Sequence, residues 1–276
     1  MWVIDSGEYL GHVDAWDRGV QFGDGLFETV LVLDGKPLHL QEHLTRLNNG
    51  LKVLSIDLEI AEFEVQLHQA LIDLLEHSGL REGVLKVIIT RGDSARGYAI
   101  PNNIKSNATF FLSKLPDFHA DIYTKGVTLK LCDTQCGIQP QLSGLKHLNR
   151  LENVLAKQEL CEEFDGLMSN FLGFVIEGTM SNVFFEKNGM LFTPNLNISG
   201  VKGVMRSLVM QVCQRQAITL QELDIKQADL PSFDAAFICN SVMGVVPVKR
   251  IKQQVLQISK TTKLLQKELN TRGENE

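Results

Sequence analysis

The chain has 276 residues, of which 44% are hydrophobic and 22% charged, and its formal net charge is -6 at pH 7. This is the composition of an ordinary globular protein, and the length suffices for one large domain or for two of average size. The acidic balance disfavours non-specific nucleic-acid binding, which needs clustered Lys and Arg, and no apolar run approaches the ~20 residues of a membrane span, so neither partner is expected.

The first half of the chain alternates between strand and helix patterns. Leucines spaced by three or four residues predict a helix over 39–54, while the Asp34-Gly35 pair is typical of a tight hairpin turn. The predicted elements are strands over 1–10, 27–40, 83–92 and 108–115, and helices over 39–54 and 59–78.

The second half is richer in strand patterns. The predicted elements are a strand over 126–132, an irregular run over 133–144, a helix after Lys146, a β-rich section over 164–178, a hairpin over 181–194 turning at 187–189, a helix near 199–214, strands over 235–241 and 245–251, and a closing helix over 253–269.

These patterns predict two α+β domains joined by one short connector. The segment 116–122 includes Pro116 and interrupts both periodicities, so we place an N-terminal domain at 1–115 and a C-terminal domain at 123–276. Ligands often bind in the cleft between two such domains.

Lys146 lies where a loop turns into the predicted helix. If the helix already includes this residue, Leu148, Leu151 and Leu155 form a core stripe roughly opposite it, and Lys146 is a solvated surface charge. Against this, its helical face would carry Asn149 and Asn153, which are poor helix formers, and Gly144 would allow close approach to the backbone. Periodicity leaves both interpretations open.

Two short motifs favour structural roles. Gly23 and Gly25 flank Asp24 as in a phosphate-binding loop, but the Lys-Ser/Thr of a P-loop is lacking, so a tight turn leading into a strand is expected. His39 and His43 have a spacing that could bind zinc, but no third ligand is evident and no metal site is predicted.

Three charged features are candidate binding groups. Arg91 and Arg96, with Tyr98, follow a predicted strand; arginines there suit carboxylate recognition, although an exposed basic loop would give the same pattern. Glu177 lies in an otherwise apolar segment, where a carboxylate needs a partner, either a structural arginine or a protonated ligand nitrogen.

The thiols indicate a reducing compartment. The five cysteines show no CxxC pair and no metal-finger spacing, and the N-terminus has no basic region followed by an apolar one. Free thiols and a cytoplasmic location are therefore expected.

Six motifs, in this order, resemble those of the fold-type IV pyridoxal-phosphate enzymes, which include branched-chain aminotransferases, D-amino-acid aminotransferases and aminodeoxychorismate lyases. They are DRGVQFGDGLFET, HLTRL, GLKHLNRLENVLAKQEL, EGTMSNVFF, GVKGVMR and ICNSVMGVVPV, spread over nearly the whole chain. The segments GLKHLNRLE, LKVIITRGDSARGYAIP and CNSVM look most like the lyases. The resemblance implies a small N-terminal α/β sandwich, a larger C-terminal β-rich pseudo-barrel, and a homodimer.

The same resemblance implies a role for each candidate residue. Lys146 would attach pyridoxal 5'-phosphate covalently, and Glu177 would pair with the pyridine nitrogen. The cofactor phosphate would be held by Arg46, by the backbone of Val204 and Met205 at a helix start, and by Asn240 and Ser241.

The lyase reaction implied is the conversion of 4-amino-4-deoxychorismate to 4-aminobenzoate and pyruvate in folate biosynthesis; the alternative is amino transfer. Arg96, with Arg91 and Tyr98, would bind substrate carboxylates. Glu28 is expected to support a turn rather than catalysis, and the tail beyond Arg250 extends past the usual end of the family.

Overall fold

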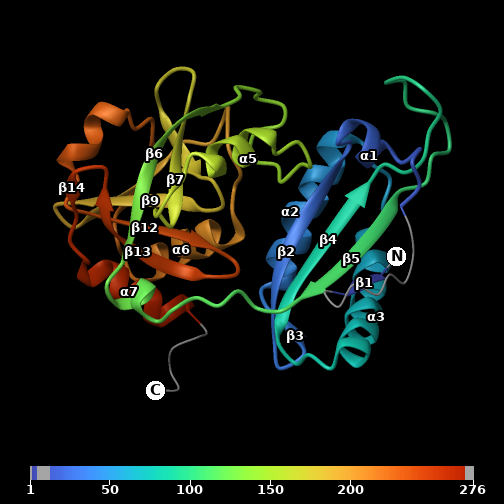
Figure 1. Ribbon diagram of the computed structural model, residues 1–276, viewed down its shortest axis with the longest axis horizontal. Coiled ribbons are helices and arrows are strands. Elements are labelled where there is room, and N and C mark those ends of the chain that lie inside the picture. Colours follow the sequence, from blue (N-terminus) through green and yellow to red (C-terminus); the bar gives the residue numbers. More distant parts are fainter. Residues whose placement is uncertain (1, 5–12, 271–276) are drawn as a thin grey trace. The chain divides into compact units, whose positions relative to one another are not determined.

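The chain forms two compact units in a computed structural model that describes residues 2–4 and 13–270 (Figure 1). The first unit comprises the residues up to Asp117 together with Leu145–Asn149, and the second comprises Phe118–Gly144 and the residues from Arg150 onward. The break after Asp117 falls inside the segment predicted as a linker. The inclusion of Leu145–Asn149 in the first unit was not predicted.

The first unit is built on a five-stranded sheet with the order β1-β5-β4-β2-β3, in which β1 pairs in parallel with β5 and the other pairs are antiparallel. Its strands are β1 (Trp2–Ile4), β2 (Gly25–Leu33), β3 (Lys36–Pro37), β4 (Gly83–Thr90) and β5 (Asn107–Ser113), and its helices are α1 (Arg18–Phe22), α2 (Leu40–Leu54) and α3 (Ile60–Ser78).

Alternation along the strands places apolar side chains on the face that the helices cover. Leu85, Val87 and Ile89 on β4 are at most 1% exposed. Helix α2 lies against β2, and α3 lies against β5 and β1. Phe63 of α3 stacks on Phe110 of β5 with ring centroids 5.9 Å apart, which fixes that helix on the sheet.

Both predicted hairpin turns are confirmed. Asp34 and Gly35 have φ values of 48° and 73°, and they join β2 to β3 with Leu33 opposite Lys36. Asn188 and Gly189 have φ values of 52° and 77° in the second unit. Positive φ at both central residues is the requirement of a type I′ turn, which Asn-Gly and Asp-Gly satisfy with little strain.

The second unit contains a nine-stranded mixed sheet: eight strands follow the order β11-β10-β9-β12-β13-β6-β7-β8, and the ninth, β14, pairs with β13. The strands are β6 (Val127–Cys136), β7 (Asp165–Asn170), β8 (Val175–Gly178), β9 (Asn182–Lys187), β10 (Met190–Pro194), β11 (Leu220–Leu223), β12 (Ala235–Asn240), β13 (Gly244–Ile251) and β14 (Gln254–Val255). The helices are α4 (Asp121–Thr124), α5 (Leu151–Gln158), α6 (Val204–Arg215), the 3-10 helix η1 (Gln227–Ser232) and α7 (Lys260–Leu269).

This sheet is curled: β8, at one end of the strand order, also contacts β9 and β10 near the other end. Register shifts in the pairs of β6 with β13 and with β7, and of β7 with β8, are consistent with the bending. Helices α6 and α7 pack on the stacked rings of Phe184 and Phe237, whose centroids lie 4.8 Å apart. The predicted β-rich C-terminal domain is therefore a partial barrel with helices.

The closing helix starts later than predicted, and the first predicted strand is described only in part. The closing helix was predicted over 253–269 but begins at Lys260, because Gln254–Val255 pairs with β13 and Ser259 caps the helix through a hydrogen bond from the Thr262 N–H. The first predicted strand is present as Trp2–Ile4, and the rest of it, residues 5–10, lies outside the described residues.

Candidate active site

Lys146 lies in an extended segment of the first unit rather than on a helix. The Phe27 N–H donates to the Lys146 carbonyl at 2.9 Å, and the Leu148 N–H donates to the Gly25 carbonyl at 3.0 Å, so the segment pairs with the start of β2. Helix α5 begins only at Leu151. The helical face on which the solvated interpretation of Lys146 depended therefore does not exist.

The glycines of QFGDG explain how this pairing is possible. A Cβ on Gly25 would lie 2.2 Å from the Ile89 carbonyl and 2.9 Å from a Leu148 methyl. Gly23 adopts φ 65° as the C-cap of α1, and its carbonyl accepts a hydrogen bond from the Asn149 amide at 3.1 Å. The predicted turn is present, and it brings the backbone of β2 against the lysine segment.

The lysine side chain is half-buried over an aromatic ring. Lys146 Nζ lies 4.3 Å from the centroid of the Phe27 ring. Phe27 also donates its N–H to the Lys146 carbonyl, so one residue of β2 contacts both the backbone and the side chain of the lysine. The ring face attracts a cation and gives the ammonium a defined place.

Arg46 is joined to a buried carboxylate on the residue after Phe27. Its Nε and Nη2 donate to the two Glu28 oxygens at 2.8 and 2.5 Å, and His43 Nδ1 lies 2.6 Å from Oε2. Glu28 is 3% exposed and lies within β2, so the expectation that it supports a turn is wrong. Burial opposes its ionisation, but the charge and hydrogen bonds of Arg46, with those of His43, lower the pKa of Glu28 to about 2.

The three residues of the predicted arginine loop have different environments. Arg91 is 5% exposed, and its guanidinium makes four hydrogen bonds, two to the Asp24 carboxylate and one each to the carbonyls of Leu54 and Ser55. Arg91 was predicted to contact a substrate carboxylate, but in the structure its guanidinium donors bind groups of the first unit. Arg96 is exposed, and Tyr98 is 83% exposed with its ring 5.2 Å from that of Phe22.

In the second unit, Glu177 adjoins the strap that leads into α6. It lies on β8, is 5% exposed, and accepts a hydrogen bond from the Val201 N–H at 2.8 Å. Asn182 holds the same strap through two bonds, to the Val201 carbonyl at 2.9 Å and from the Gly203 N–H at 3.1 Å. A buried carboxylate thus lies beside the chain that starts the helix.

Helix α6 begins at Val204 with the features of an anion site. Its N-cap is Gly203, which has no side chain to bond the first N–H groups, and its first turn has no acidic residue. Val204 and Met205 are 4% and 3% exposed, so their side chains are fixed by the core. The first N–H groups of a helix lack partners within the helix and carry its positive dipole end, which suits a phosphate.

The loop after β12 contains the last two predicted residues. Asn240 uses its side chain locally: Oδ1 accepts from the N–H groups of Val242 and Met243 at 2.9 Å each, and Nδ2 donates to the Met180 carbonyl at 3.0 Å. Ser241 is half-buried beside it. Asn240 therefore shapes the turn that presents Ser241.

The described residues contain no metal site of the usual kind. No group of three or more His, Cys, Asp or Glu side chains in residues 2–4 and 13–270 could hold a metal ion. His43 is committed to Glu28 instead. Over the same ranges, no helix has the length and apolar character that crossing a bilayer takes.

Comparison with known proteins identifies the family. The model of the family described as amino-transferase class IV matches residues 25–251. The chain belongs to this family. Among curated relatives, the aminodeoxychorismate lyase of Vibrio harveyi is 36% identical over 94% of this chain and 96% of its own. The D-alanine aminotransferase of Bacillus licheniformis is 29% identical over 88% and 84%.

Solved structures agree with the class IV assignment. The crystal structure of 4-amino-4-deoxychorismate lyase from Pseudomonas aeruginosa matches with a TM-score of 0.87 and 37% identity, covering 95% of this chain and 96% of that one. The predicted fold-type IV architecture is confirmed by this likeness.

Two residues important to this class IV chain escaped the sequence analysis. Asn182 follows Ser181 in the EGTMSNVFF motif, and Arg18 follows Asp17 in the DRG motif, but neither was assigned a role. Asn182 bonds residues 19 and 21 positions away, and Arg18 bonds a loop 76 to 81 positions away as well as Asp24, six positions away. A buried Asn or Arg gives no periodic signal, so only the motif membership itself pointed to them.

Proposed function

We propose that this chain is an aminodeoxychorismate lyase, which converts 4-amino-4-deoxychorismate to 4-aminobenzoate and pyruvate in folate biosynthesis. The observation that carries the proposal is the 36% identity to the Vibrio harveyi lyase over nearly the full length of both chains. The Pseudomonas aeruginosa lyase supports it with 37% identity and a TM-score of 0.87. The D-alanine aminotransferase of Bacillus licheniformis is more distant, at 29%.

The cofactor in this proposal is pyridoxal 5'-phosphate, and the residues fit its chemical groups. Lys146 supplies an amine for covalent attachment, and Glu177 supplies a buried carboxylate for a protonated pyridine nitrogen. In this proposal the phosphate is bound by Arg46, by the N–H groups of Val204 and Met205, and by the Asn240–Ser241 turn. The start of α6, where the N-cap Gly203 has no side chain to bond the first N–H groups, supports that assignment most strongly.

The guanidinium of Arg46, which we assign to the cofactor phosphate, is already oriented by Glu28. Its Nε and Nη2 are held by the Glu28 carboxylate, which fixes the plane of the guanidinium. A guanidinium that a carboxylate already holds in one orientation loses less conformational entropy when it binds an anion. Glu28 is therefore a positioning residue in this proposal.

The reaction is an elimination that needs no oxidant or reductant. The C–H bond at the amine-bearing ring carbon and the C–O bond to the enolpyruvyl group break, the ring becomes aromatic, and the released enolpyruvate takes up a proton to become pyruvate. When bound, pyridoxal phosphate supplies an electron sink for the pair left by the departing proton. Lys146 is the base that we assign to that proton.

Glu177 has an electronic role in the proposal. A carboxylate beside the pyridine nitrogen keeps that nitrogen protonated, because the ion pair favours the charged form of both partners. The Val201 N–H that donates to Glu177 at 2.8 Å holds the carboxylate in one orientation. Glu177→Gln is expected to cut turnover sharply while the cofactor still binds.

The substrate carries two carboxylates, and the exposed loop after β4 offers groups for one of them. Arg96 has an exposed guanidinium, and Tyr98 adds a phenol hydroxyl close by in sequence. Arg91 is left out of this role because of its bonds to Asp24, Leu54 and Ser55.

The second candidate is a class IV aminotransferase acting on D-amino or branched-chain amino acids. The 29% identity to the Bacillus licheniformis D-alanine aminotransferase favours it over other chemistries. The same preparation, loaded with pyridoxal phosphate, should be given aminodeoxychorismate and, separately, D-alanine or a branched-chain amino acid with 2-oxoglutarate. Formation of 4-aminobenzoate supports the lyase, and amino transfer without 4-aminobenzoate would replace it.

We also propose that the enzyme is a cytoplasmic homodimer. Support for the compartment comes from its five free cysteines, four of them buried and Cys161 exposed. The dimer follows from the family resemblance. Sedimentation equilibrium of the holoenzyme tests it: a mass near twice 30.9 kDa is expected, and a mass near 30.9 kDa would contradict the dimer.

A further inference from the structure

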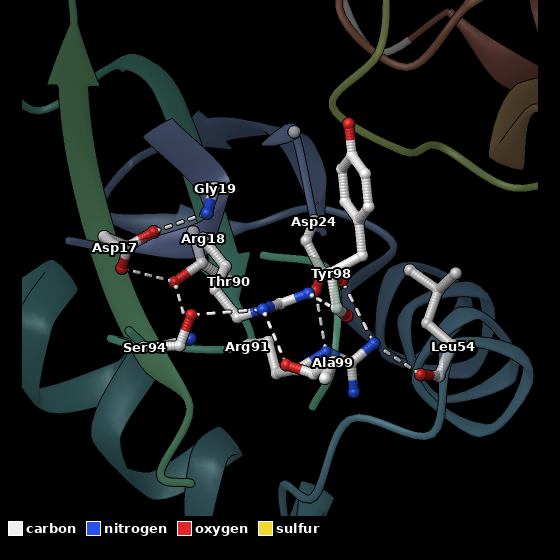
Figure 2. A network of polar contacts seen from close by, with 12 residues as sticks. Asp17, Arg18, Gly19, Asp24, Leu54, Thr90, Arg91, Ser94, Tyr98 and Ala99 are labelled. Carbon is white, nitrogen blue, oxygen red and sulfur yellow. Dashed lines mark hydrogen bonds and ion pairs between the residues drawn. The ribbon is translucent and has the colours of Figure 1, made fainter. Parts of the chain in front are cut away.

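Arg18 is a buried arginine whose donors converge on the loop that carries Arg96 and Tyr98 (Figure 2). It is 3% exposed on helix α1. Its Nη1 donates to the Ser94 hydroxyl at 3.1 Å and to the carbonyls of Gly97 and Ala99 at 3.3 Å each, and its Nη2 donates to the Tyr98 carbonyl at 3.0 Å. Three consecutive carbonyls are thus held by one guanidinium.

The bonds from Arg18 to the loop residues 97–99 go to their backbone carbonyls and do not involve the side chains of Arg96 and Tyr98. In Figure 2 the Tyr98 carbonyl lies within the cluster while its phenol points away from it. The Tyr98 ring contacts Phe22 at 5.2 Å, and the Arg18 guanidinium lies 5.0 Å from the centroid of the same Phe22 ring. Backbone and ring are therefore held by one small helix, while Arg96 and Tyr98 are both exposed residues.

Helix α1 has five residues, and local contacts hold it in place. Asp17 caps it by accepting from the Gly19 N–H at 2.7 Å, and Asp17 also accepts from the Thr90 hydroxyl at 2.6 Å and the Asn107 amide at 2.9 Å. These bonds tie the helix to β4 and β5. Arg18 therefore projects from a rigid support.

Asp24 extends the cluster to helix α2, which carries Arg46. Its Oδ2 accepts from Arg18 Nε at 2.8 Å and from Arg91 Nε at 2.7 Å, and Arg91 reaches the carbonyls of Leu54 and Ser55 at the end of α2. Burial acts to raise the pKa of Asp24, but hydrogen bonds and charges from Arg91 and Arg18 hold it below its ordinary value. A cation at the C-terminus of α2 is also favoured by the helix dipole.

We propose that Arg18 is a positioning residue for substrate recognition, because it fixes the backbone of residues 97–99 and so sets where Arg96 and Tyr98 present their side chains. This inference rests on the proposed function in one respect, that Arg96 binds a substrate carboxylate. A planar fork is required, since a single ammonium cannot reach the Ser94 hydroxyl, the Asp24 carboxylate and the carbonyls together. Arg18 touches neither substrate nor cofactor in this account.

The first test reads the loop without any reaction. Trypsin can cleave after Arg96, which is exposed, so the rate of that cleavage reports how firmly the loop is held. Arg18→Gln should speed cleavage at Arg96 about fivefold, because the four hydrogen bonds from Arg18 to residues 94–99 are lost. Asp24 keeps Arg91 as a partner in this variant, so no carboxylate is left unpaired. Cleavage after the exposed Lys125 of the second unit is the internal standard.

The second test reads substrate recognition in the holoenzyme. Arg18→Gln should raise KM for aminodeoxychorismate about tenfold and change kcat by about twofold or less, because the cofactor and its lysine are not contacted. Arg18→Lys should rescue only part of the loss. Arg81→Gln, which removes the same charge from an exposed position of the first unit, is the matched control and should leave both constants unchanged.

A double-mutant cycle decides whether Arg18 acts through the loop. Arg96→Gln alone should raise KM, and adding Arg18→Gln to it should raise KM by much less than in the wild type, because the side chain being positioned is gone. Full additivity of the two effects would overturn the proposal. So would unchanged cleavage at Arg96, or an unchanged KM, in Arg18→Gln.

The outcomes separate this inference from the proposed function. If the wild type makes no 4-aminobenzoate, the lyase proposal fails, and KM for the amino-acid substrate takes its place in the cycle. If Arg96→Gln leaves KM unchanged, Arg96 is not a substrate ligand and the inference fails with it. If Arg18→Gln has the same Tm as the wild type but is cleaved faster at Arg96 and has a higher KM for the substrate, the inference stands. Ser94→Ala, a milder change that removes one Arg18 acceptor, should move the cleavage rate in the same direction if Arg18→Gln does not fold.

Discussion

Glu28 and Arg46 form a two-point ion pair in the interior of the first unit, with Oε1 accepting from Nε at 2.8 Å and Oε2 from Nη2 at 2.5 Å. The Glu28 side chain is 4% exposed and that of Arg46 13%. A pair with this geometry holds an arginine in one plane, which is the condition for using it as an anion ligand. The pair therefore connects the stability of the first unit with the proposed binding of the cofactor phosphate.

Glu28→Gln should both destabilise the protein and weaken cofactor binding. The amide cannot neutralise Arg46, and its NH2 group faces donors from Arg46 or His43, so a buried charge loses its partner. Urea denaturation should show a free energy of unfolding lower by about 3 kcal/mol. Titration with pyridoxal phosphate should show a higher Kd. Glu82→Gln, at an exposed position beside β4, is the control and should change neither value. Wild-type cofactor affinity in Glu28→Gln would contradict the positioning role.

The same pair predicts a stability loss in acid. The pKa of Glu28 is lowered from 4.5 to about 2 in the folded protein, so its contribution is fully present above the unfolded pKa and is lost as the pH falls from 4.5 towards 2. At about 1.4 kcal/mol for each pKa unit, the contribution is on the order of 3 kcal/mol. Urea unfolding from pH 7 to pH 3 should show a steeper loss of stability in the wild type than in Glu28→Gln. Parallel pH profiles would show that Glu28 titrates normally.

Asn182 and Gly203 should behave as one unit in cofactor binding. A Cβ on Gly203 would lie 2.1 Å from Asn182 Oδ1, so Gly203→Ala must push the amide away and break its bonds to the strap. Asn182→Ala removes the same bonds directly. Each variant should weaken pyridoxal phosphate binding by about tenfold, and the double variant should be little worse than either single one. If absorbance titration showed that the two losses of cofactor affinity add, the contact between Asn182 and Gly203 would have no role in cofactor binding.

The cysteines provide a test of the packing that does not involve the site. Burial, the first cause in each case, raises the pKa of Cys132 and Cys239 to about 12 and that of Cys213 to about 11, so these thiols should be unreactive in the folded protein. Cys161 is exposed. Ellman's reagent should label one thiol quickly in the native protein and all five after unfolding. Cys161→Ser should remove the fast phase, and fast labelling that survives this change would mean that one of the four buried thiols is accessible.

Elements defined by local chemistry were predictable from the sequence. The turns at Asp34-Gly35 and Asn188-Gly189 follow from the positive φ that Gly and Asn tolerate. The leucine spacing of α2 and the alternation of β4 follow from one-sided burial. The closing helix was placed too early because its apolar pattern runs on from β14, although Ser259 marks its true start.

The sites depended on partners distant in the chain, which no local pattern reveals. Lys146 was expected near a helix start, yet its backbone pairs with Phe27, more than 100 residues earlier. The family resemblance favoured Arg96 over Arg91 as a carboxylate ligand, but the sequence did not show that Asp24 binds Arg91 while Arg96 is exposed. Family motifs pointed to the lysine and to Arg96, and the fold added the partners of Arg91.

The most direct test of the whole account is the formation of 4-aminobenzoate by the wild type and by Lys146→Ala, both folded and supplied with pyridoxal phosphate. The wild type should release 4-aminobenzoate and pyruvate in equal amounts, and Lys146→Ala should release neither above the uncatalysed rate. Product from Lys146→Ala at the wild-type rate, or none from the wild type, would contradict the claim that this chain is a lyase acting through Lys146.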